Sequence, residues 1–104
     1  GYVVIQPTHI DSRSLGFEIK SENLREMYSQ MLHVSVTRRQ DMSFILDSLG
    51  LIQEMVPDLK GKMDTSNLVA AGHSMGAATA MLVSGMKLVN PMDGSEESSD
   101  ENRF

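Results

Sequence analysis

The sequence predicts an α/β fold with a mostly parallel sheet, to which this chain contributes two strands and their flanking helices. Two short apolar runs, at 2–6 and 67–71, have the character of buried strands. The stretch between them has apolar residues at helical spacing. Strands that alternate with helices favour a parallel sheet joined by right-handed crossovers.

The first expected strand ends at Pro7, which cannot donate to a ladder, and a polar loop follows at 7–14. Open α/β sheets place their ligands just past the carboxyl ends of their strands. His9 and Asp11 lie in this loop and therefore allow two interpretations. They form a wall of an active site or contact a substrate, or they are hydrogen-bonding residues that fix the turn.

Two helices are expected next. Ser21 is placed to cap a short one, which is followed by a longer helix over about 37–55 that Pro57 ends. The apolar positions of the short helix are Leu24, Met27, Tyr28, Met31 and Leu32. The buried stripe expected on the long helix consists of Phe44, Ile45, Leu49, Ile52 and Met55 or Val56.

The sequence GHSMG at 72–76 joins the second strand to a small-residue helix that begins at about Ala77. A nucleophile elbow has this form: a serine on a sharp, strained turn between strand and helix, with nearly side-chain-free residues two places before and after it. Gly72 and Gly76 occupy those places around Ser74. The alternative is an ordinary glycine-rich turn between a strand and a helix.

The remaining features limit the function. A net charge of −5 argues against a nucleic-acid partner, and no apolar run is long enough for an integral membrane segment. The chain has no cysteine and no zinc-peptidase or nucleotide-binding motif, so we expect no metal and no cofactor. Residues 91–104 are expected to form a polar loop, with an acidic, serine-rich stretch at 95–101 that lacks the spacing of a calcium loop.

A serine at such a turn can act as a nucleophile. Its hydroxyl attacks a substrate once a neighbouring base accepts its proton. The backbone N–H of Met75 would lie at a helix N-terminus, where it can donate to the oxyanion that develops in the transition state. Ser74 is therefore the candidate catalytic residue and Met75 the candidate oxyanion donor.

The GHSMG turn resembles the elbow of the α/β-hydrolase superfamily. The stretches at 1–4, 7–12 and 39–47 are similar to the dienelactone hydrolase and platelet-activating-factor acetylhydrolase-like branch. This resemblance implies about eight mostly parallel strands, of which this chain holds two neighbouring central ones. It also implies the chain order serine, acid, histidine, which places the acid and histidine beyond Phe104 and the second oxyanion donor before Gly1.

The function expected from the resemblance is hydrolysis of a small carboxylic ester through an acyl-enzyme on Ser74. On this view residues 1–104 are part of one α/β-hydrolase domain, and alone they would show no meaningful catalysis. Two alternatives stay open. A noncatalytic binding protein of similar fold could keep the turn for packing, or the same scaffold could carry out peptide cleavage or acyl transfer.

Overall fold

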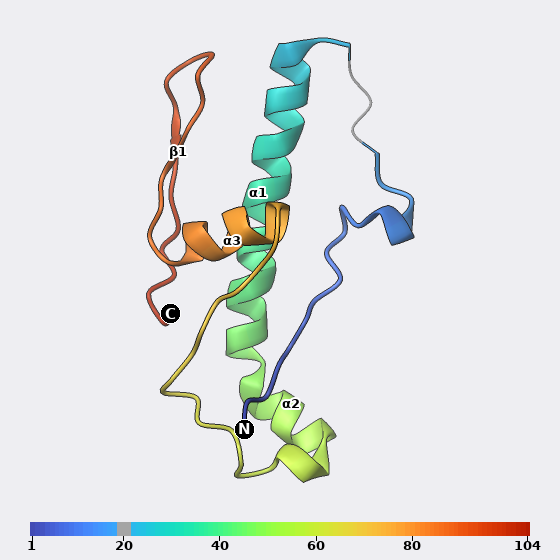
Figure 1. Cartoon of the computed structure of the whole chain (residues 1–104), viewed down its shortest axis with the longest axis vertical. Coiled ribbons are helices and arrows are strands. Elements are labelled where there is room, and N and C mark those ends of the chain that lie inside the picture. The colour runs from blue at the N-terminus through green and yellow to red at the C-terminus, as the bar shows by residue number, and fades with distance from the viewer. Residues whose placement is uncertain (19–21) are drawn as a thin grey trace.

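The computed structural model describes residues 1–18 and 22–104, and its architecture is mostly helical (Figure 1). A long helix α1 (Leu24–Asp47) is followed by α2 (Leu49–Met55) and, later in the chain, by α3 (Met75–Val83). Two short 3-10 turns, η1 (Arg13–Leu15) and η2 (Pro57–Leu59), lie in the connections. The strands β1 (Leu88–Val89) and β2 (Glu96–Glu97) pair antiparallel near the C-terminus.

The expected parallel sheet is wrong for this structure. Within the described residues, the one sheet is the antiparallel β1–β2 pair, and no backbone–backbone hydrogen bond involves residues 2–6 or 67–71. Figure 1 shows both segments as extended traces that rise alongside α1 toward α3. An apolar run becomes a strand only when a neighbouring strand accepts its backbone hydrogen bonds, and these two segments do not pair with each other.

Helix α1 is continuous where two helices are expected. Residues 33–37 contain neither glycine nor proline, and the hydroxyls of Ser35 and Thr37 donate to the carbonyls of Met31 and His33 at 2.9 and 3.0 Å. The break falls instead at Ser48, between α1 and α2. The observed N-cap is Asn23, whose side chain accepts from the Arg25 N–H at 2.9 Å, while the expected cap Ser21 lies outside the described residues.

The core is small and sits where α3 lies across α1 (Figure 1). Among the described residues, the buried apolar side chains are Leu82 and Val83 of α3, Val34 of α1 and, at the start of α2, Leu49. Of the stripe expected on the long helix, Leu49 is buried, and Ile45 and Ile52 are half-buried. Phe44 and Met55 are 70% and 72% exposed, so the expectation is wrong at these two positions. No sheet covers that face in the described residues, and helical spacing alone cannot show whether a partner element is present.

The C-terminal segment is more ordered than the expected solvated loop. Leu88 and Val89 face Glu97 and Glu96 across the β1–β2 pair, and Gly94 takes a positive φ of 73° in the connection. Beyond β2 the chain contacts α1, because the Ser43 hydroxyl donates to Glu101 Oε2 at 2.8 Å. Arg103 Nη1 also lies 2.7 Å from Asp47 Oδ1, so the end of the segment is held by side-chain contacts with α1.

In the part of the chain that the structure describes, no helix combines the length and the apolar character needed to cross a membrane.

The contact between the C-terminal segment and α1 is expected to weaken at low pH. Paired hydrogen bonds from Arg103, helped by the Ser43 hydroxyl, lower the pKa of Glu101 from its ordinary value of 4.5 to about 2. Because the pKa is lower in the folded state, this stabilisation is complete above pH 4.5 and is lost as pH falls toward 2. Urea unfolding at a series of pH values measures the loss, which Glu101→Gln is expected to reduce. An identical pH dependence in this variant would contradict the assignment.

Candidate functional site

Ser74 stands at the head of α3 in an unusual backbone conformation. Its φ is 54° and its ψ is −121°, and among the described residues it is the one non-glycine residue with positive φ. Such a conformation costs on the order of 1–3 kcal/mol and persists only where the surrounding structure enforces it. Strain of this kind concentrates at functional sites, so the turn is a candidate site on its geometry alone.

Of the two glycines that flank Ser74, only Gly72 lies too close to other backbone atoms for a side chain to fit. A Cβ at Gly72 would collide with the carbonyl group of Gly76 and lie 2.7 Å from the nitrogen of Ala77. A Cβ at Gly76 would meet nothing within 4 Å outside its own turn of helix. The turn therefore requires glycine at position 72, whereas the space at position 76 would accept a methyl group.

Two polar groups of the turn, the Ser74 hydroxyl and the Met75 N–H, are not used in the hydrogen bonds that begin α3. Ser74 is the N-cap of α3, yet its side chain makes no capping hydrogen bond, so Oγ is not committed to the helix. The N–H groups of Gly76 and Ala77 bond to the carbonyls of His73 and Ser74 at 2.9 and 3.0 Å. No backbone carbonyl among the described residues accepts from the Met75 N–H, which lies at the positive end of the helix dipole.

A groove of about 1130 Å³ joins this turn to the N-terminal segment. Residues 69–76 line one part of it and residues 2–9 another. His9 and Asp11, the two loop residues singled out in the sequence, line the same groove as Ser74. All of the candidate residues therefore line one groove, although the predicted parallel sheet does not form.

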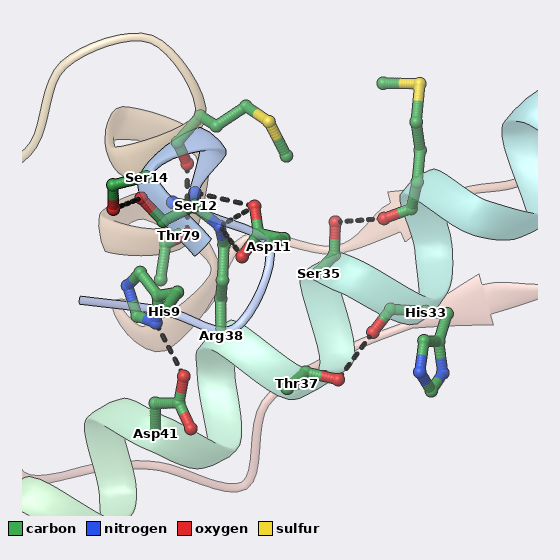
Figure 2. A network of polar contacts seen from close by, with 12 residues as sticks. His9, Asp11, Ser12, Ser14, His33, Ser35, Thr37, Arg38, Asp41 and Thr79 are labelled. Carbon is green, nitrogen blue, oxygen red and sulfur yellow. Dashed lines mark hydrogen bonds and ion pairs between the residues drawn. The ribbon is translucent and has the colours of Figure 1, made fainter. Parts of the chain in front are cut away.

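His9 is held by a carboxylate on α1. Its Nδ1 lies 2.6 Å from Oδ2 of Asp41, and its side chain is 11% exposed (Figure 2). The sequence reasoning assigned no role to Asp41. The signal that points to it is its position three residues after Arg38, which places both side chains on one face of α1.

Asp11 is engaged by Arg38 from the same helix face. The Nε of Arg38 donates to both carboxylate oxygens at 2.9 Å, and Nη2 donates to Oδ2 at 2.8 Å (Figure 2). The Asp11 carboxylate is buried, and the loop beside it is closed by a 2.9 Å hydrogen bond from the Ser12 N–H to the His9 carbonyl. Of the two interpretations of Asp11, the contacts favour the one in which it fixes the loop.

Within residues 1–18 and 22–104, no group of three or more histidine, cysteine, aspartate or glutamate side chains is arranged to hold a metal ion. Comparison of the chain with protein-family models, curated proteins and solved structures found no significant match.

The one-sided contact in the turn gives a matched pair of variants. Gly72→Ala places a methyl group against the backbone of Gly76 and is expected to lower the free energy of unfolding by about 1–3 kcal/mol. Gly76→Ala meets no obstacle, and alanine is favoured over glycine in helices, so its stability is expected to be equal or higher. Urea unfolding of both variants tests this. Equal destabilisation would contradict the geometry.

A second pair of variants tests the anchor of the loop. Arg38→Gln leaves the Asp11 carboxylate buried without its partner, and is expected to cost about 3 kcal/mol of unfolding free energy. Among the described residues, the neighbouring Arg39 has one ion pair, a loose contact of 3.8 Å with Glu97, so Arg39→Gln should change stability by less than about 0.5 kcal/mol. Thermal and urea unfolding measure both. A similar loss of unfolding free energy in the two variants would show that the contact of Arg38 with Asp11 stabilises the fold no more than that of Arg39 with Glu97.

Proposed function

We propose that Ser74 is the nucleophile of a serine hydrolase that acts on small carboxylic esters. The observation that carries the proposal is the strained conformation of this one residue, with φ of 54° at the start of a helix that its hydroxyl does not cap. An ordinary strand-to-helix turn would relieve the strain with glycine and would use a serine hydroxyl as a cap. Neither of these features is present at Ser74.

In the proposed reaction, Ser74 Oγ attacks the ester carbonyl and loses its proton to a base. The carbonyl oxygen becomes an oxyanion, to which the free Met75 N–H donates, and one such donor is commonly worth about 3 kcal/mol in the transition state. The C–O bond to the alcohol then breaks and leaves an acyl group on Ser74. Water attacks this acyl-enzyme, releases the carboxylic acid and restores the serine.

The apolar side chains along the groove fit the uncharged part of an ester. Val3, Ile5 and Val69 line it together with Ala70 and Ala71. The likeness of the GHSMG turn to the α/β-hydrolase elbow, and of the stretches at 1–4, 7–12 and 39–47 to the dienelactone hydrolase-like branch, supports the same reaction class. The proposal depends on the local geometry of the turn and does not require the parallel sheet.

A fluorophosphonate probe tests the proposal directly, because it reacts covalently with activated serine nucleophiles. We expect the protein to be labelled at Ser74, with the site identified by mass spectrometry, and Ser74→Ala to abolish labelling. Ser84→Ala, which removes a serine at the other end of α3, serves as the matched control and should label normally.

The resemblance places the acid and the histidine beyond Phe104, so the decisive protein is one that also contains those residues. Absence of labelling in that protein would contradict the proposal and favour a noncatalytic binding role. If labelling occurs, hydrolysis of p-nitrophenyl esters compared with peptide amides distinguishes an esterase from a peptidase. Appearance of the acyl group on an added alcohol or amine would instead identify acyl transfer.

A further inference from the structure

A second cavity, of about 570 Å³, adjoins the groove at the residue that follows the candidate nucleophile. Met75 lines both cavities. Gly16, Phe17 and Val34 line only the second one. Because Met75 is bonded directly to Ser74, this cavity begins one residue away from the proposed site of reaction. We call the second cavity the Met75 pocket.

The inner wall of the Met75 pocket is apolar, and the part of its wall that faces solvent is charged. Val34 is buried and Phe17 is half-buried. The exposed charged residues of the wall are Arg13 and Glu18. The buried charged residue, Asp11, accepts hydrogen bonds from Arg38 with both carboxylate oxygens, so its charge is balanced. A cavity with an apolar interior and a polar rim suits an uncharged hydrocarbon chain that is attached to a polar group.

The backbone of Met75 is fixed, whereas its side chain is adaptable. Its carbonyl accepts a hydrogen bond from the Thr79 hydroxyl at 3.0 Å, and α3 starts at this residue. The side chain is 36% exposed, and an unbranched thioether with several rotatable bonds fills irregular space easily. The Met75 N–H can therefore keep its place as oxyanion donor while the side chain forms a wall that the two cavities share.

We propose that the Met75 pocket binds the acyl chain of the ester and that the Met75 side chain limits the length of chain that the pocket accepts. This inference rests on the proposed function. In the acyl-enzyme, the acyl carbon is bonded to Ser74 Oγ and its oxygen lies at the Met75 N–H, so the acyl chain starts beside Met75. The chain stays bound while the alcohol leaves and water enters, and the larger groove of about 1130 Å³ serves that exchange.

Binding of unreactive ester analogues tests this proposal without a need for catalysis. The probes are the N-methylamides of straight-chain acids from acetic to decanoic acid, titrated into the ¹⁵N-labelled full chain and followed by NMR. Each CH₂ group that enters the pocket is expected to tighten binding about fourfold, and the increase should stop at the length that fills the pocket. The backbone amide signals of Gly16 and Phe17 should shift as the amides bind.

Two variants should move this length limit in opposite directions. Met75→Ala removes part of the shared wall and should let the increase continue for about two further CH₂ groups, each giving about fourfold tighter binding. Phe17→Trp adds volume inside the pocket and should weaken binding of the longest chain that the wild type accepts about tenfold or more. Met81→Ala is the matched control, because Met81 lies on the same helix, is 51% exposed and lines neither cavity. Its chain-length profile should equal that of the wild type.

The same chain-length profile in the wild type and in Met75→Ala would overturn the proposal, and so would the absence of binding by every amide. Circular dichroism confirms that the variants are folded, and Met75→Ala alone decides if Phe17→Trp does not fold. The proposed function fails separately, since amide binding does not depend on an activated serine. If Ser74 is labelled but the amides lack the expected length dependence, the hydrolase proposal stands and the assignment of the pocket falls. If the amides follow the expected profile but Ser74 is not labelled, the pocket binds acyl chains and the hydrolase proposal falls.

Discussion

The ion pair between Asp11 and Arg38 is the interaction on which the arrangement of the candidate site depends. Among the described residues, the N-terminal segment pairs with no strand, and the contacts that relate it to α1 are made by side chains. Arg38 donates to both oxygens of a buried carboxylate, a geometry that fixes direction as well as distance. With Asp11 held in this way, His9 lies within reach of Asp41, one turn along the same helix.

The turn at Ser74 is fixed by different means. Its strain must be offset by the packing of α3, and the side chains that supply this packing are Thr79, Leu82 and Val83, all buried. The hydroxyl of Thr79 donates to the Met75 carbonyl at 3.0 Å, so its burial leaves no unpaired donor (Figure 2). The serine can therefore hold a costly conformation because the helix that follows it is anchored in the small core.

The structural features that could be predicted from the sequence are local ones. The turn at 72–76, the helix after it and the end of α2 before Pro57 each follow from a few adjacent residues. The sheet was not predictable in this way, because residues 2–6 and 67–71 have strand character but form no strand without a partner. The His9–Asp41 contact joins residues 32 positions apart, and no periodicity or motif in the sequence indicates a contact between residues so widely separated.

The site therefore combines parts with different physical origins. Ser74 and the Met75 amide are placed by backbone geometry, which side-chain changes elsewhere disturb little as long as α3 stays packed. His9 is placed by two pairs of side chains, His9 with Asp41 and Asp11 with Arg38. Replacement of one member of a pair removes the contact. The relative position of Ser74 and His9 in the groove consequently depends on the contact between α1 and α3.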